Sequence, residues 1–197
     1  MPDDRQFVRI IDASMAEAAR KSGAWLACRP GCAQCCIGPF PISQLDARRL
    51  RQGLAALETR DPERAARVRE RARAAVVRMA PDFPGDPETG VLAEGADAVA
   101  RFETLADDDP CPALDPETRT CDLYSARPVT CRMFGPAVRY GRGALAACEL
   151  CYAGASDEQI AACAVDIDPD RLESALLDEL ERATGARGQT LVAFALK

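Results

Sequence analysis

The chain has 197 residues, ten cysteines, no histidine and a formal net charge of −6. This length suffices for one domain with its own hydrophobic core, so the cysteines are not needed to hold a miniature fold together. The lack of histidine excludes mixed cysteine–histidine zinc fingers, Rieske centres and any nucleophile that depends on a histidine base. The negative charge argues against nucleic acid as a partner.

The N-terminus carries no sign of a secretory signal, because Met1 to Asp4 contain no basic residue and no long apolar run follows them. No window approaches the roughly 20 apolar residues that a membrane span requires. We therefore expect a cytoplasmic protein without a membrane partner. In a reducing cytoplasm, ten thiols are better explained as metal ligands than as disulfides.

The first half of the chain predicts three helices. Apolar residues at helical spacing place the first over residues 7–19, with Gly23 to end it. Ser43, with Asp46 three residues later, resembles a capping box for a second helix that continues to about Leu57. The third, over residues 62–80, starts with proline in its first turn and has an arginine-rich face that we expect to be solvated.

The second half predicts shorter elements between turns. A loop is expected over residues 81–90, and short helices over residues 96–105 and 127–134. A well-marked helix follows over residues 169–183, whereas the tail, residues 190–196, could be strand or helix. Because alternating β-branched runs are scarce, we predict an all-α fold: a single cysteine-cluster domain over residues 1–197, organised around metal-binding loops.

The cysteines fall into three groups in turn-rich sequence. Two of them, Cys32-x2-Cys35 and Cys148-x2-Cys151, have a spacing that aims both sulfurs at one ion, and together they could form a four-thiolate zinc site. The remaining thiols are too many for core filler, which suggests more than one centre. Adjacent residues Cys35 and Cys36 are expected to point apart, which suits a polynuclear iron–sulfur cluster.

The spacing Cys28-x3-Cys32-x2-Cys35 also resembles the radical S-adenosylmethionine signature. Those enzymes resemble one another in having a β/α barrel or most of one, which needs alternating strands and a longer chain. The residue before their last cysteine is usually aromatic, and here it is Gln34. The context therefore argues against radical chemistry.

The cysteine pattern as a whole resembles the YkgJ-type cysteine-cluster family, which is described as chelating zinc or iron. The resemblance covers residues 28–136 and rests on an ordered succession of motifs: Cys28-x3-Cys32-x2-Cys35-Cys36, Cys111-Pro112, Cys121-x2-Tyr124 and Arg127-Pro128-x2-Cys131-Arg132-x-Phe134. It implies metal chelation by the seven cysteines of these motifs, with Cys148 or Cys151 as a further ligand. The Cys148–Cys151 pair is a departure from the family pattern.

We accordingly predict nine metal ligands: Cys28, Cys32, Cys35, Cys36, Cys111, Cys121, Cys131, Cys148 and Cys151. Cys163 is left out, because Ser156 starts a helical segment on which it could face the core. Arg127 and Arg132 could offset thiolate charge, or pair with aspartate instead. Tyr124 and Phe134 could shield the site from water or be ordinary core residues.

Three functions remain open. The first is a metal-binding module with a structural or redox role, holding an iron–sulfur cluster or zinc, with iron–sulfur narrowly favoured because nine candidate thiolates occur without a histidine. The second is a metal-dependent modifying enzyme, by similarity to the flagellin lysine N-methylases, which carry such a cluster. The third is a zinc-organised interaction module that uses the arginine-rich helix to bind a protein partner. No catalytic residue can be assigned.

Overall fold

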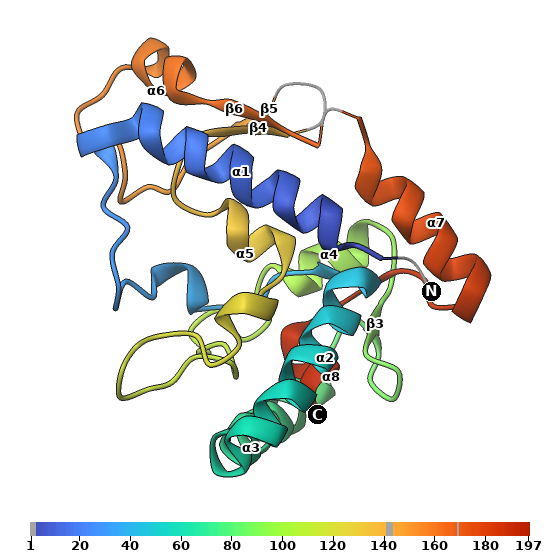
Figure 1. The fold of residues 1–197 in the computed structure, drawn as a ribbon. Helices are drawn as coiled ribbons and strands as arrows, with labels where there is room; N and C mark the ends of the chain where they lie inside the picture. The colour runs from blue at the N-terminus through green and yellow to red at the C-terminus, as the bar shows by residue number, and fades with distance from the viewer. Residues whose placement is uncertain (1–2, 141–143, 169) are drawn as a thin grey trace. The chain divides into compact units, whose positions relative to one another are not determined.

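The computed structural model describes residues 3–140, 144–168 and 170–197 (Figure 1). The chain forms two compact units. Unit 1 consists of Met1–Arg29 and Val129–Gly185, and unit 2 of Pro30–Pro128 and Ala186–Lys197. Each unit is therefore built from two separate stretches of sequence, and each is described by itself.

Unit 1 is built on the first helix, α1 (Arg5–Ser22), which ends at Gly23 as predicted. Its buried face, with Phe7, Ile11 and Met15, packs on the short helix α5 (Val129–Met133) and on a small sheet. Figure 1 shows α5 alongside α1 (blue). The unit also contains a turn of 3₁₀-helix (Gly23–Trp25), α6 (Asp157–Cys163) and α7 (Leu172–Thr184).

The sheet of unit 1 corrects the all-α prediction. It has three strands in the order β5 (Ala144–Ala146), β4 (Val138–Tyr140) and β6 (Val165–Ile167). β4 runs antiparallel to β5 and parallel to β6, with Val138 opposite both Ala146 and Val165. Each strand is only three residues long, too short for a two-residue alternation to stand out in the sequence. The fold is mostly helical, with small sheets.

Unit 2 is dominated by α2 (Gln44–Arg60) and α3 (Pro62–Met79), with α4 (Ala96–Phe102) and α8 (Val192–Leu196). Its 3₁₀ turns cover Gln34–Cys36, Ala80–Asp82 and Tyr124–Ala126. Two short antiparallel pairs join β1 (Ile42–Ser43) to β7 (Gln189–Thr190) and β2 (Gly85–Asp86) to β3 (Val91–Leu92). No helix in the described part of the chain is long and apolar enough to cross a membrane.

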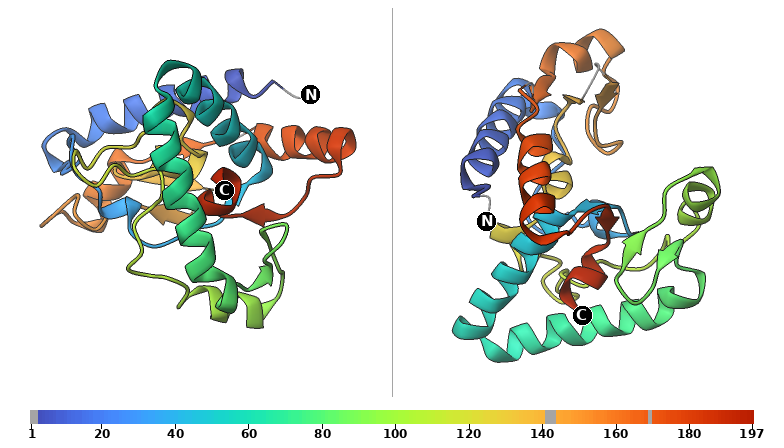
Figure 2. Two further views of the ribbon diagram at one scale, coloured as in Figure 1. Left: turned by 90° about the horizontal axis from the view of Figure 1, so that it is seen from below. Right: turned by 90° about the vertical axis from the view of Figure 1, so that its right-hand side faces the viewer.

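The core of unit 2 lies where α2, α3 and α8 meet. Leu50, Leu54 and Leu57 of α2 pack against Val68 of α3 and Leu196 of α8. Both views of Figure 2 show α8 (red) beside the long helix α3 (green). The ambiguous tail contains both elements: Thr190 ends the strand β7, and Val192–Leu196 form α8, whose five residues are all buried.

The predicted helix starts are confirmed at two caps. The Ser43 hydroxyl accepts a hydrogen bond from the Asp46 amide at 3.2 Å, and the Asp61 carboxylate accepts one from the Arg64 amide at 3.0 Å. The last long helix begins later than expected, at Leu172. Its first amides donate to the Asp168 carboxylate, which lies one turn upstream.

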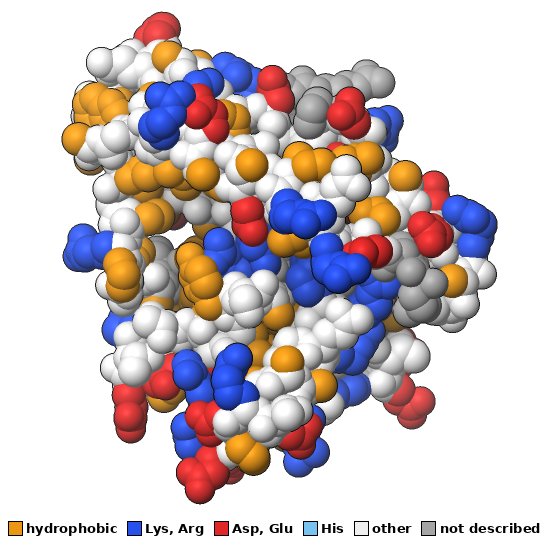
Figure 3. Space-filling model, in the orientation of Figure 1, with side chains coloured by type: hydrophobic (Ala, Val, Ile, Leu, Met, Phe, Trp, Pro, Cys, Tyr) orange, Lys and Arg blue, Asp and Glu red, His pale blue; other side chains and the backbone are white. Residues whose placement is uncertain are grey.

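The arginine-rich face of α3 is not simply solvated. Arg69 pairs with Glu58 at 2.6 Å, and Arg78 pairs with Asp109 at 2.8 Å. In the lower part of Figure 3, where α2 and α3 lie, basic and acidic side chains alternate over the surface. Part of the positive charge of α3 is therefore paired with acidic side chains.

Candidate metal centre

The ten cysteines are all free thiols, and they divide equally between the units. Unit 2 contains Cys32, Cys35, Cys36, Cys111 and Cys121, and unit 1 contains Cys28, Cys131, Cys148, Cys151 and Cys163. The two CxxC pairs thus lie in different units. Each group is considered within its own unit.

In unit 2, backbone pairing joins the first cysteine motif to the second. The Cys111 amide donates to the Cys36 carbonyl at 2.7 Å, and the Gly38 amide donates to the Asp109 carbonyl at 2.9 Å. Between these bonds, Ile37 and Pro110 form an antiparallel bridge. Two cysteines from motifs far apart in the sequence are therefore held side by side by the main chain.

The segment from Cys111 to Cys121 folds back on itself as an irregular hairpin. Leu114 and Cys121 form an antiparallel bridge, and the Leu114 amide donates to the Cys111 carbonyl at 2.9 Å. The Asp115 carboxylate closes the turn by accepting the amides of Glu117 and Thr118. The hairpin brings Cys121 back beside Cys111, and both side chains pack against the core of unit 2.

Helix α3 anchors this hairpin through a buried carboxylate. Asp122, directly after Cys121, pairs with Arg64 through one oxygen and with Arg71 through the other. Arg71 also donates to the Pro112 carbonyl at 2.9 Å. Two arginines expected on a solvated face thus hold the cysteine hairpin instead. The sequence offered one sign of this, an aspartate beside a motif cysteine, and we missed its role.

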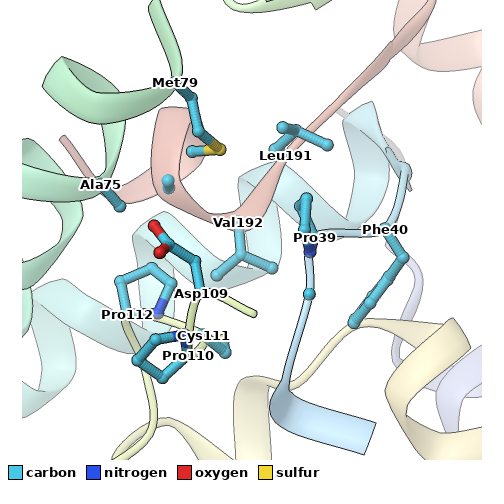
Figure 4. A pocket seen from close by; sticks show the side chains of 12 residues that line it. Pro39, Phe40, Ala75, Met79, Asp109, Pro110, Cys111, Pro112, Leu191 and Val192 are labelled. Atoms are coloured by element: carbon cyan, nitrogen blue, oxygen red, sulfur yellow. The ribbon is translucent and has the colours of Figure 1, made fainter. Parts of the chain in front are cut away.

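A small apolar pocket of about 30 Å³ lies beside Cys111 (Figure 4), enough for one water-sized molecule. Met79 and Leu191 lie at one end of the view, and Cys111 and Pro110 at the other. Burial raises the pKa of the Cys111 thiol to about 12 and also raises that of Cys121. Both sulfurs therefore stay protonated at neutral pH unless a cation compensates the thiolate charge.

The vicinal pair Cys35 and Cys36 corrects a second expectation. The neighbouring Cys36 thiol, together with burial, raises the pKa of Cys35. We expected the side chains to point apart, as on an extended strand. They lie instead in a 3₁₀ turn (Gln34–Cys36), where neighbouring side chains do not alternate between two faces. Cys32 lies half-buried just before this turn.

Arg127 was predicted to offset thiolate charge, and its position is consistent with that role. Its charge lowers the pKa of both Cys35 and Cys121, although burial and neighbouring groups outweigh it. Its guanidinium carbon lies 3.8 Å from the centre of the Tyr124 ring. Tyr124 is 65% exposed and Phe134 is 42% exposed, so neither is a core residue.

In unit 1, Gly135 joins two predicted ligands. It has a φ of +110°, and a Cβ atom built there would lie 2.7 Å from the Cys28 sulfur. Its carbonyl accepts the Cys148 amide at 3.2 Å. Only glycine allows both the backbone conformation and the close approach of Cys28. This residue lies within the family motif region, but we did not predict its role.

The Cys148–Cys151 segment is a tight turn, as its spacing predicted. The Cys151 amide donates to the Cys148 carbonyl at 2.9 Å, and burial together with the neighbouring Cys151 raises the pKa of the Cys148 thiol. Tyr152 fixes the end of this turn: its amide donates to the Trp25 carbonyl at 2.9 Å, and its hydroxyl accepts the Ala137 amide at 2.7 Å. The same hydroxyl hydrogen-bonds to Ser22.

The remaining cysteines of unit 1 differ in their surroundings. Cys131 lies half-buried on α5, where its neighbour Arg132 is buried and pairs with Asp12 at 2.7 Å. Arg132 therefore takes the aspartate partner that we had considered as an alternative. Cys163 is buried at the end of α6, and its thiol donates to the Lys21 carbonyl at 3.4 Å. This agrees with a core position.

Within the residues that the structure describes, no three Cys, Asp or Glu side chains lie close enough together to hold a metal ion. What the structure brings together are pairs: Cys35 with Cys36, Cys111 with Cys121, and Cys148 with Cys151. The ninefold ligand set remains a prediction.

Comparison with known proteins identifies the family. A family model named CxxCxxCC, with the description "Putative zinc- or iron-chelating domain", matches residues 27–161, more than half of the chain. This span contains all nine predicted ligands and ends before Cys163. Comparisons with curated proteins and with solved structures gave no match. The resemblance to the YkgJ type is confirmed, and the chain belongs to the CxxCxxCC family.

Proposed function

We propose that this protein binds zinc or iron through cysteine thiolates. The family's description supports chelation of one of these metals. The observation that carries the proposal is the backbone pairing of Cys36 with Cys111, since it places cysteines from two distant motifs at one place.

Thiolate sulfur is a donor that zinc and iron prefer, and unit 2 supplies it from Cys35, Cys36, Cys111 and Cys121. Burial raises the pKa of Cys111 and Cys121, so ionising them without a cation is costly. A bound cation would offset that cost, and Arg127 would stabilise any remaining negative charge. We therefore assign Cys32, Cys35, Cys36, Cys111 and Cys121 as the ligands of unit 2.

For unit 1, we propose Cys28, Cys131, Cys148 and Cys151 as ligands. Gly135 supports this group, because it contacts the Cys28 sulfur and holds the Cys148 backbone. The metal would tie together turns that have few apolar side chains of their own, so a structural role follows directly. Free thiols throughout the chain suit a reducing compartment such as the cytoplasm.

Between the two metals, we favour an iron–sulfur cluster. Nine candidate thiolates without one histidine exceed what a single zinc ion needs. Such a cluster would supply electron transfer when bound. The argument from divergent Cys35 and Cys36 side chains no longer supports this choice, because the pair lies in a 3₁₀ turn and not on an extended strand. The preference depends on the number of thiols alone.

The deciding experiment is anaerobic purification from cells supplied with iron, followed by metal analysis, sulfide analysis and an absorption spectrum. We expect iron and acid-labile sulfide in a coloured protein. Stoichiometric zinc in a colourless protein would end the iron–sulfur assignment and retain chelation. A folded protein without either metal would contradict the proposal.

Single substitutions then test the ligands. Cys36→Ser, Cys111→Ser and Cys131→Ser should each lower the metal content, because each removes a sulfur donor. The matched control is Cys163→Ser, which removes a buried thiol outside the matched family span. Equal metal loss in all four variants would show that the proposed ligand set is wrong.

A further inference from the structure

We propose that Cys148 and Cys151 form a reversible disulfide by exchange with a small-molecule disulfide of the glutathione class. This goes beyond metal binding, because it assigns a redox reaction to one particular pair of thiols.

The turn gives this pair a suitable geometry for a disulfide. The Cys151 amide donates to the Cys148 carbonyl, which is the hydrogen bond of a β-turn. In a β-turn the first and fourth Cα atoms lie within about 7 Å, and disulfides span Cα distances of about 4.4–6.8 Å. Little backbone movement is therefore needed to join them.

Both ends of this turn are fixed. On one side, the Cys148 amide is held by the Gly135 carbonyl at 3.2 Å. On the other side, two hydrogen bonds hold Tyr152: its amide donates to the Trp25 carbonyl, and its hydroxyl accepts one from the Ala137 amide. Because the turn is fixed by contacts other than the cysteines, the two thiols stay near each other when no metal is bound.

The two cysteines also differ in access. Cys148 is half-buried and is followed by the exposed residues Glu149 and Leu150, whereas Cys151 is 5% exposed. A small disulfide can therefore reach Cys148 first. Cys151, covered by the protein, is positioned to react only with the sulfur of Cys148. This division between an accessible and a covered thiol suits a two-step exchange.

The reaction balances as follows. The Cys148 thiolate attacks one sulfur of the small disulfide, whose S–S bond breaks and releases one thiolate. The Cys151 thiolate then attacks the Cys148 sulfur of the mixed disulfide and releases the second. The protein pair loses two electrons, the small disulfide gains them, and the two protons pass through solvent to the two released thiolates.

The pair Cys35 and Cys36 serves as an internal comparison. Here too one thiol affects the other, because the Cys36 thiol raises the pKa of Cys35. However, consecutive Cα atoms are only about 3.8 Å apart across a trans peptide bond, below the usual range for a disulfide. Proximity of sulfurs is thus common to both pairs, and backbone spacing suits only Cys148 and Cys151.

The test uses full-length Cys163→Ser protein, both as purified and after chelation, equilibrated anaerobically with mixtures of glutathione and glutathione disulfide. After alkylation of free thiols and digestion with trypsin, residues 143–171 form one peptide whose only cysteines are Cys148 and Cys151. In the chelated sample, mass spectrometry should show this peptide without alkyl groups and two hydrogens lighter than the same peptide with two free thiols. At one glutathione ratio, its disulfide should exceed that of Cys35–Cys36 by at least about tenfold.

A persistent glutathione adduct on Cys148 without an internal disulfide would overturn the inference, as would equal oxidation of Cys35–Cys36. A single-cysteine comparison supports the order of attack: Cys151→Ser should accumulate the adduct on Cys148, and Cys148→Ser should accumulate much less on Cys151. Metal content of the untreated protein is measured separately. A metal-free protein that forms the disulfide refutes only the proposed function, and a metal-bound protein that cannot form it after chelation refutes only this inference.

Discussion

In unit 2, Cys111 and Cys121 lie against the hydrophobic core, and their hairpin is tied to α3 through Asp122. In unit 1, Cys28 is exposed, and Cys148 and Cys151 lie in a turn held by Gly135 and Tyr152. Packing and an ion pair therefore support Cys111 and Cys121, whereas a backbone turn supports Cys148 and Cys151. These predicted ligands have two different kinds of support, which should respond differently to substitution.

Among single substitutions, the largest effect is expected from Asp122→Ala in unit 2. The change leaves Arg64 and Arg71 without their shared carboxylate, and breaking a buried ion pair costs about 3–5 kcal/mol. We expect about 3 kcal/mol, because both arginines keep some solvent access. Urea denaturation of the metal-free protein measures it.

The matched control for Asp122→Ala is Glu58→Ala, which removes the partner of Arg69 on the surface of the same helix pair. Exposed pairs contribute about 0–1 kcal/mol. If both variants lose the same stability, Asp122 does not anchor the cysteine hairpin.

A pH titration should separate the metal-free and metal-bound protein. Burial raises the pKa of Cys111 to about 12, above the roughly 8.5 of an unfolded cysteine. The folded state therefore holds this proton more tightly, so stability is complete below about pH 8.5 and falls as pH rises toward 12, by about 1.4 kcal/mol per pKa unit. Urea midpoints of chelated, reduced protein measure this.

With metal bound, Cys111 carries no proton in the folded state, so this loss at high pH should disappear. Cys111→Ser should also flatten the curve of the chelated protein. An unchanged slope in that variant would show that Cys111 is not the group responsible.

A smaller effect is expected from Gly135→Ala in unit 1. The substitution strains the backbone at a φ of +110° and places a methyl group against the Cys28 sulfur. Strain of this kind costs about 1–3 kcal/mol. Gly95→Ala is the control, since Gly95 has a φ of +111° with open space around its Cβ position. Only Gly135→Ala should also lower the metal content; equal metal content in both variants would remove Gly135 from the proposed centre.

The smallest effect is expected from Cys163→Ser. A serine hydroxyl can replace the thiol as donor to the Lys21 carbonyl, so stability should change by about 1 kcal/mol or less. Thermal unfolding of this variant beside Cys131→Ser compares a core thiol with a proposed ligand in the same unit. A larger loss at Cys163 would reverse their assignments.

The helices were predictable because their signals are local. Ser43 and Asp61 cap helices as expected, and the apolar stripe of α1 packs where its spacing indicated. The strands were not, because each is too short to show a pattern and exists only through its pairing with distant residues. The burial of α8 could not be predicted either, because it depends on contacts with the apolar faces of α2 and α3.

The candidate ligands were predictable from cysteine spacing and family resemblance, and their supports were not. Asp122 acts through Arg64 and Arg71, which are distant in sequence. Gly135 matters through its contact with Cys28, which spacing does not reveal. The orientation of Cys35 and Cys36 depended on a 3₁₀ turn that the sequence did not mark clearly. Spacing thus indicates which donors exist, and tertiary contacts decide how they are held.

The buried helix α8 has a consequence for synthesis of the protein. Unit 2 draws most of its residues from Pro30–Pro128 but completes its core only with Ala186–Lys197. A ribosome must therefore translate the whole of Val129–Gly185 before the core of unit 2 can close. During that interval, the cysteines from Cys32 to Cys121 have been synthesised, but the finished core does not yet hold them in place. Premature oxidation or mismetallation of nascent chains would be most damaging in this window.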